Sequence, residues 1–190
     1  MTDPVNERRD LIILGGGLVG MSLALAAAKE GLTSHVVDRA SAAELTAEGV
    51  DGRASAISTA SWNLFVNIGL GDQLAALGCP IDAIAVTDQM KPGRLDFRPG
   101  PDEGSLGYMY ANRDLRLALF AAAEREPAIA WHSSAEVISR ERGEHGVAVT
   151  LNDGRVLTGS LLVAAEGRHH QPVMKWALVW PSGIIATAHK

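Results

Sequence analysis

The sequence predicts an α/β fold in which a parallel central sheet carries a smaller antiparallel sheet. An apolar run at residues 11–14 is followed by a glycine-rich turn, a helix-forming stretch at 18–30 and a second strand at 34–38, which is the order of a βαβ unit. Short strands separated by Pro-Gly turns begin at residue 81 and predict an antiparallel insertion. A second apolar run at 161–165 predicts a return to the parallel sheet.

Composition favours a globular protein and excludes some partners. The 190 residues are 47% hydrophobic, and 17 basic against 22 acidic residues give a net charge of −5. No basic block is present, so we expect no nucleic-acid partner. The single cysteine, Cys79, excludes an intramolecular disulfide and a cysteine-based zinc site. We expect it to be a small buried side chain in a reducing cytoplasm.

The turn after the first strand has the spacing G-x-G-x-x-G, with Gly15, Gly17 and Gly20. The first glycine allows a tight turn, the second lets backbone N–H groups approach a pyrophosphate, and the third lets the helix pack closely on the strand. The N-terminus of the helix would then hold the phosphates. Gly31 is placed to end the helix.

Asp38 ends the second strand, 18 residues beyond Gly20. An acid at about this distance from the glycines binds the ribose hydroxyls of a dinucleotide and disfavours a ribose phosphate. The alternative is a glycine-rich turn in an unrelated fold, with Asp38 merely solvated.

A secretory signal is a second alternative, because Arg8 and Arg9 precede the apolar stretch. Asp10 next to the apolar run, three consecutive glycines and the following strand in βαβ register all argue against it.

Between the first βαβ unit and residue 111 the chain predicts a helix and then the insertion. Ser55 or Ser58 can cap a helix that ends at Gly69. Arg53 would precede this helix, either as a phosphate contact or as a surface arginine. Strands are expected at 81–87, 95–97 and 106–110, and they could form a wall over the reactive ring of a cofactor.

The rest of the chain predicts one helix and a strand series. Asn112 can cap a helix over 113–124. Arg113 and Arg116 at its start indicate a nearby anion or carboxylate, with solvated surface as the alternative. Strands are expected at 129–131, 136–140, 147–151 and 156–160, with a hairpin turn at 152–154. The run 161–165 should be a strand buried on both faces, ending in a turn at 166–168 where ligands of open α/β sheets bind.

Four motifs in this order resemble the flavin-dependent aromatic hydroxylases, most closely the ubiquinone-biosynthesis branch that includes the 2-octaprenyl-6-methoxyphenol hydroxylases. They are I-L-G-G-G-L-V-G with Asp38, D-G-R-A-S-A-I at 51–57, N-R-D-L at 112–115 and V-A-A-E-G-R at 163–168. The resemblance covers residues 10–168.

The resemblance implies an FAD site whose reductant is NADH or NADPH. The family uses O₂ to place one oxygen atom on an activated phenol ring, here of a polyprenyl phenol, and assigns no catalytic acid or base to this chain. It implies pyrophosphate binding at the glycines, adenosine ribose at Asp38, Arg53 and Arg113 along the cofactor, and Val137 at the adenine. The full expected cofactor site is Gly15, Gly16, Gly17, Leu18, Val19, Gly20, Asp38, Arg39, Arg53, Arg113, Val137, Glu166 and Gly167.

The resemblance also implies a Rossmann-like FAD-binding domain with a partial substrate sheet, in an incomplete chain. Residues 1–80 would form the first part of the FAD-binding domain, 81–111 the partial substrate-domain insertion, 112–168 the return to the FAD-binding domain and 169–190 an atypical tail. Glu166 and Gly167 begin a second fingerprint, D-G-x-x-S-x-x-R, in which His170 and Val173 replace the serine and the arginine. We expect His169, His170 and His189 to be solvated, with no metal site.

The protein should be cytoplasmic, with a possible peripheral membrane or multienzyme association. The alternatives are an NAD-binding Rossmann dehydrogenase and an inactive nucleotide-binding fragment.

Overall fold

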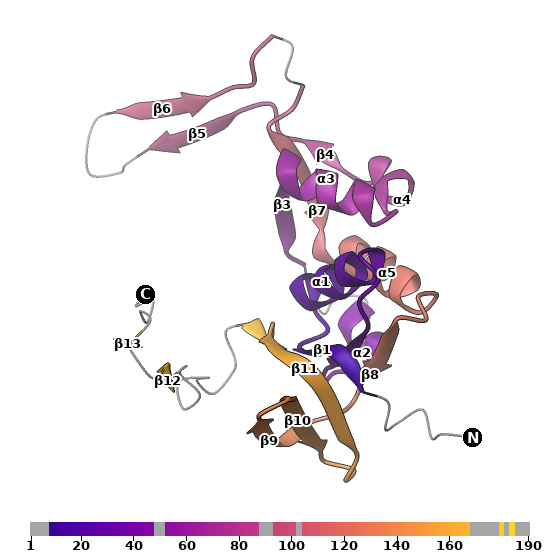
Figure 1. The fold of residues 1–190 in the computed structure, drawn as a ribbon. Coiled ribbons are helices and arrows are strands. Elements are labelled where there is room, and N and C mark those ends of the chain that lie inside the picture. Colours follow the sequence, from indigo (N-terminus) through magenta and orange to yellow (C-terminus); the bar gives the residue numbers. More distant parts are fainter. Residues whose placement is uncertain are drawn as a thin grey trace.

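The central sheet has six strands in the order β8-β2-β1-β11-β10-β9 (Figure 1). The structure is a computed structural model that describes residues 8–47, 52–87, 93–101 and 104–167, together with the backbone at 179–180 and 183–184. The first four strands in that order are parallel, and β10 and β9 are antiparallel to their neighbours. The expected parallel sheet is confirmed. The six strands are β1 (Arg9–Leu14), β2 (Ser34–Val37), β8 (Ile129–His132), β9 (Val137–Gly143), β10 (Gly146–Leu151) and β11 (Val156–Ala164).

Helices α1 (Leu18–Lys29) and α5 (Asn112–Ala123) pack against each other on one face of the parallel strands. Burying each aliphatic side chain of this layer contributes about 1.5 to 3 kcal/mol. Gly31, at φ +80°, follows the last turn of α1 in a conformation that glycine adopts without strain, as expected. The layer includes Ile13, Met21, Ala24, Val36, Leu115 and Leu119, all fully or nearly fully buried.

A second buried cluster lies on the opposite face, because alternate residues of a strand point to opposite sides. It joins Ile12 and Leu14 of β1 to Val149 and Leu151 of β10 and Leu157 of β11. Strand β11 belongs to both parts of the sheet. Residues 156–159 pair with β10 and residues 159–164 pair with β1. The turn at 152–154, with Gly154 at φ +87°, confirms the expected hairpin.

The expected division into strands at 156–160 and 161–165 is wrong, since β11 is one continuous strand. The expectation that its second half is buried on both faces is also wrong. The side chain of Leu161 is 56% exposed, while Leu162 and Val163 are half-buried. The apolar run coincides with the part of β11 that pairs with β1. The helical layer does not cover Leu161.

The antiparallel part lies beside this core. Strands β3 (Ala54–Ser58), β7 (Gly107–Ala111) and β4 (Cys79–Pro80) form one sheet, in the order β3-β7-β4. Strands β5 (Ile84–Thr87) and β6 (Arg94–Phe97) form a hairpin that extends away from the rest (Figure 1). The helices here are α2 (Ala42–Thr46), α3 (Thr59–Asn67) and α4 (Gly71–Ala75). The backbone pair β12 (Val179–Trp180) and β13 (Gly183–Ile184) lies in the expected tail.

Four local expectations have different outcomes. Ser58 caps α3 by accepting a hydrogen bond from the Ser61 N–H, so the second of the two expected caps is correct. Arg53 therefore precedes a strand and not a helix. Asn112 does not cap α5, because its buried side chain accepts a hydrogen bond from the Ser55 hydroxyl. Cys79 is exposed and not buried.

Candidate functional site

The glycine turn joins β1 to α1 with almost no room for side chains at two positions. Gly15 has φ +104°, and a Cβ atom there would lie 2.5 Å from the Ala165 carbonyl oxygen. A Cβ atom at Gly20 would lie 1.8 Å from the Gly15 carbonyl oxygen. These glycines are therefore required by the packing of strand, turn and helix.

Gly17 differs from its neighbours because no atom lies within 4 Å of the place where its Cβ would be. It is the N-cap residue of α1, it makes no side-chain capping hydrogen bond, and the first turn of α1 contains no acid. The first N–H groups of a helix have no partner within the helix, and its N-terminus carries partial positive charge. The space beside Gly17 therefore fits the pyrophosphate of a dinucleotide.

Asp38 lies directly after β2 and is held in place by the backbone. One carboxylate oxygen accepts the Gly16 N–H at 2.6 Å, and the other accepts the Ala40 N–H at 2.8 Å. The carboxylate is half-buried. Each oxygen keeps a further lone pair, so the fixed carboxylate can also accept hydrogen bonds from ribose hydroxyls.

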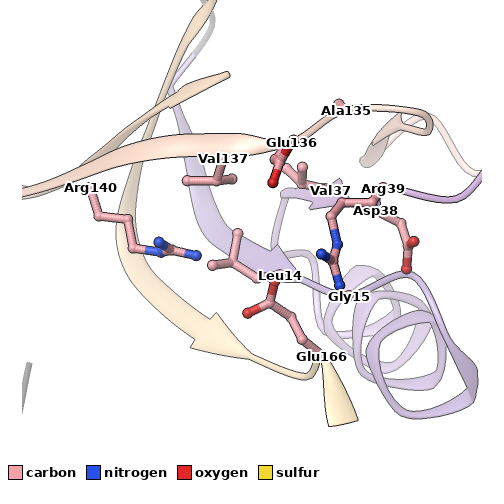
Figure 2. A pocket seen from close by; sticks show the side chains of 10 residues that line it. All are labelled: Leu14, Gly15, Val37, Asp38, Arg39, Ala135, Glu136, Val137, Arg140 and Glu166. Carbon is pink, nitrogen blue, oxygen red and sulfur yellow. The ribbon is translucent and has the colours of Figure 1, made fainter. Parts of the chain in front are cut away.

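A pocket of about 100 Å³ opens beside Asp38 at the carboxyl ends of β1 and β2 (Figure 2). It contains five of the residues that the sequence predicts for a cofactor site, and five that it does not. The predicted residues are Gly15, Asp38, Arg39, Val137 and Glu166, and the others are Leu14, Val37, Ala135, Glu136 and Arg140.

Two of the missed residues had a signal in the sequence, since Leu14 and Val37 directly precede Gly15 and Asp38. Ala135, Glu136 and Arg140 had none. The chain brings them to the site through the loop from β8 to β9, where the Ala135 N–H donates to the Asp38 carbonyl oxygen at 2.9 Å.

Arg53 and Arg113 are brought close to one another, although neither lines the pocket. Strands β3 and β7 pair Ala54 with Ala111, and the Asn112 N–H donates to the Arg53 carbonyl oxygen at 3.0 Å. The side chain of Arg113 donates through Nε to the Thr46 carbonyl oxygen at 2.9 Å.

The carbonyl groups at the end of α2 are partners of the two cations at the start of α5. Arg116 donates to the Leu45 carbonyl oxygen at 3.4 Å, next to the contact that Arg113 makes. The last carbonyls of a helix carry partial negative charge. These two contacts are with carbonyl oxygens, and the nearby anion or carboxylate that the sequence pattern indicates stays a prediction.

The remaining predicted residues lie at the two ends of the site. Leu18 and Val19 form the first turn of α1, and the Val19 side chain is 71% exposed. Gly167, at φ +72°, follows Glu166. Arg168 and the three histidines expected to be solvated, His169, His170 and His189, lie outside the described residues.

A series of polar side chains in contact with one another begins at His132, where β8 ends and the loop to β9 starts. Arg155 donates to His132 Nδ1 at 3.2 Å, and His132 Nε2 lies 3.0 Å from Nδ1 of the buried His35. Because arginine cannot accept a hydrogen bond, we assign the proton of neutral His132 to Nε2. Burial, His35 and the Arg155 cation, in that order, lower the pKa of His132 to about 4. Asp153 forms an ion pair with Arg155 at 2.6 Å.

The ionisable side chains that line the pocket are the carboxylates Asp38, Glu136 and Glu166 and the guanidinium groups of Arg39 and Arg140. No helix among the described residues is long and apolar enough to span a membrane. No group of three or more metal-ligating side chains gathers in the same part of the chain.

Comparison with known families and sequences identifies the type of domain. The model of a family described as FAD binding domain matches residues 8–175. The ubiquinone hydroxylase UbiL of Rhodospirillum rubrum is 38% identical over 171 residues, which cover 90% of this chain and 40% of that protein. The 3-demethoxyubiquinol 3-hydroxylase of Escherichia coli K12 is 30% identical over 168 residues, which cover 87% and 43%. The chain thus spans about two fifths of the length of these curated relatives.

Solved structures share the fold. The flavin-dependent monooxygenase PieE, in complex with FAD and substrate, aligns with a TM-score of 0.68 at 21% identity, over 86% of this chain and 31% of that one. The Diels-Alderase PyrE3 of pyrroindomycin biosynthesis aligns with a TM-score of 0.67 at 25% identity, over 84% and 32%.

Proposed function

Because this chain belongs to the FAD binding domain family, we propose that it holds FAD in a monooxygenase that hydroxylates the phenolic ring of a ubiquinone precursor with NAD(P)H and O₂. The observation that carries the proposal is the open space at Gly17 beside the fixed carboxylate of Asp38. A pyrophosphate and an adenosine ribose need these two features side by side.

The residues of this chain bind and orient the cofactor. The N–H groups of Gly17, Leu18, Val19 and Gly20, at the start of α1, face the pyrophosphate. Gly15 and Gly16 shape the turn beneath it, with their N–H groups donated to the Val37 carbonyl oxygen and to Asp38. Asp38 accepts from the ribose hydroxyls. FAD, when bound, supplies the chemistry that activates O₂ and transfers oxygen.

The other assigned residues complete the site. Arg39 and Val137 border the adenosine, while Arg53 and Arg113 lie along the cofactor. Glu166 and Gly167 close the turn after β11. The domain boundaries predicted from the sequence belong to the same proposal.

The substrate class is supported by the relatives, two of which are named as hydroxylases of ubiquinone or demethoxyubiquinol. A polyprenyl tail is strongly apolar, so we place the enzyme in the cytoplasm at the membrane surface. Sedimentation with phospholipid vesicles tests that placement.

The proposed reaction is tested with purified protein loaded with FAD. The assay follows oxidation of NADH and of NADPH in air, with and without a polyprenyl phenol, and measures the product by mass spectrometry. We expect a flavin absorbance spectrum from this chain. We expect a ring product heavier by one oxygen atom, with ¹⁸O incorporated from ¹⁸O₂, only when the chain is joined to the remaining length that its relatives have. A flavin-loaded protein of that full length that gave only the unchanged phenol would contradict the substrate class, and a chain that took up no flavin would contradict the cofactor.

A further inference from the structure

The position of the adenine base follows from the proposed positions of the pyrophosphate and the ribose. The space at the N-terminus of α1 takes the pyrophosphate, and Asp38, at the end of the neighbouring strand β2, takes the ribose. The base continues from the ribose on the side away from the helix. There the pocket is bounded by Val37, Ala135, Val137 and Arg140 (Figure 2).

Strand β9 is irregular where it meets this pocket. Its pairing with β10 shifts by one residue, because Thr150 pairs with Ser139 while Leu151 pairs with Val137. Ile138 is the extra residue, and its side chain is 63% exposed. Such bulges turn side chains toward new directions and are common beside functional sites.

The bulge explains why two residues three positions apart both line the pocket. In a regular strand Val137 and Arg140 would point to opposite faces. With Ile138 turned outward, both reach the same cavity. In Figure 2 the guanidinium group of Arg140 extends into the opening from β9, across from Asp38 and Arg39.

We propose that Arg140 is a nucleotide-specificity residue, whose guanidinium plane covers the adenine against the apolar wall formed by Leu14, Val37 and Val137. A planar cation stacks favourably on an aromatic ring, and the buried side chains of Leu14 and Val37 give the other side of the slot an apolar surface. The inference rests on the proposed FAD site. It adds that β9 selects the adenosine half of the dinucleotide.

The test compares FAD, ADP and FMN as ligands of the unaltered chain and three variants. Arg140→Gln removes charge and plane, Arg140→Lys keeps the charge and loses the plane, and Arg142→Gln is the matched control. Arg142 is exposed on the same strand, opposite Val147. Dissociation constants come from flavin fluorescence and, for ADP, from calorimetry, and thermal unfolding shows that each variant is folded.

We expect Arg140→Gln to weaken FAD and ADP binding by about tenfold, the effect of a partly desolvated cation–aromatic contact, and to leave FMN binding unchanged. The FAD and ADP affinities of Arg140→Lys should be closer to those of Arg140→Gln than to those of the unaltered chain. The affinities of Arg142→Gln should match those of the unaltered chain. An FAD affinity of Arg140→Gln within about twofold of the unaltered chain, or equal losses for FAD and FMN, would overturn the role of Arg140 alone. An unaltered chain that bound neither FAD nor ADP would overturn the FAD site and this inference together.

Discussion

Asp38 has two tasks at the residue scale, since it fixes the turn through Gly16 and Ala40 and presents a carboxylate to the pocket. We predict that Asp38→Ala weakens FAD by about 1.5 to 3 kcal/mol, the value of a hydrogen bond to a charged group. FMN should be affected less, because it has no adenosine ribose. Equilibrium titration of both flavins measures the difference.

The control for Asp38→Ala is Asp96→Ala. Asp96 pairs with Arg94 at 2.6 Å on the β5–β6 hairpin, and it is not among the residues of the pocket. Equal losses of FAD and FMN affinity in Asp38→Ala would refute the ribose contact.

Asp38 and Arg140 show what a sequence can reveal about a site. Asp38 was predictable because glycine spacing and strand length fix its distance from the turn within one βαβ unit. Arg140 was not, because its direction depends on a bulge defined by pairing with β10. Arg53 and Arg113 were predicted together from motifs, and β3 and β7 do bring their backbones close.

At the scale of elements, β11 exchanges one partner strand for another at Gly159. A Cβ atom there would lie 2.8 Å from Ile12 Cγ1 and 3.3 Å from the Arg9 carbonyl oxygen. We predict that Gly159→Val lowers the free energy of unfolding by about 1 to 3 kcal/mol through overpacking. Urea unfolding followed by circular dichroism measures the loss.

Gly143→Val provides the comparison, because the nearest atom to a Cβ at Gly143 is 3.8 Å away. This variant should unfold at nearly the same urea concentration as the unaltered chain. If the two variants were equally stable, the crossing at Gly159 would not be as tight as described.

The contacts from Asp153 through Arg155 and His132 to His35 join β2, β8 and the β10–β11 turn. They make the free energy of unfolding depend on pH. Since the pKa of His132 in the folded state is lowered to about 4, the unfolded chain binds a proton at a higher pH than the folded chain does. The free energy of unfolding should therefore fall by about 2 kcal/mol as pH drops from about 6.5 to 4. His132→Gln should reduce this slope, as measured by urea unfolding across that range.

The charged groups that act on His132 are Arg9, Asp153 and Arg155, and the neighbouring imidazole is that of His35. Hydrogen bonds from the Thr33 backbone and the Arg155 backbone lower the pKa values of Asp10 and Asp153, respectively, below the usual 3.8. His145→Gln, at an exposed position in the turn between β9 and β10, is the control. An unchanged slope in His132→Gln would mean that His132 does not carry the effect.

Elements formed by local signals were predictable, and those that depend on distant partners were less so. The run from β1 through α1 to β2 follows from an apolar stretch, three glycines and a helix stop. Strand β3 was missed because its residues alternate between exposed and half-buried, and it is held by β7 about fifty residues away. The same pairing takes Asn112 away from the capping role that its position suggested.

For the whole molecule, the sequence predicted the layered α/β architecture because buried parallel strands leave continuous apolar runs. It overestimated the burial of β11, since an apolar run shows what a strand can bury and not which helices cover it. The hairpin β5–β6 shows the same limit. Ile84, Val86, Leu95 and Phe97 pair across its strands and are 44 to 57% exposed.

The central claim, that FAD is held at the open glycine of the turn, is tested most directly by titrating FAD into the unaltered chain, Gly17→Val and Gly143→Val. No atom lies within 4 Å of a Cβ at Gly17, so Gly17→Val should still fold without FAD, and thermal unfolding checks this. Its valine would occupy the space of the pyrophosphate. We predict that Gly17→Val loses FAD affinity by about a hundredfold or more, while Gly143→Val retains it. A folded Gly17→Val protein with the FAD affinity of the unaltered chain would place the dinucleotide elsewhere and contradict the account.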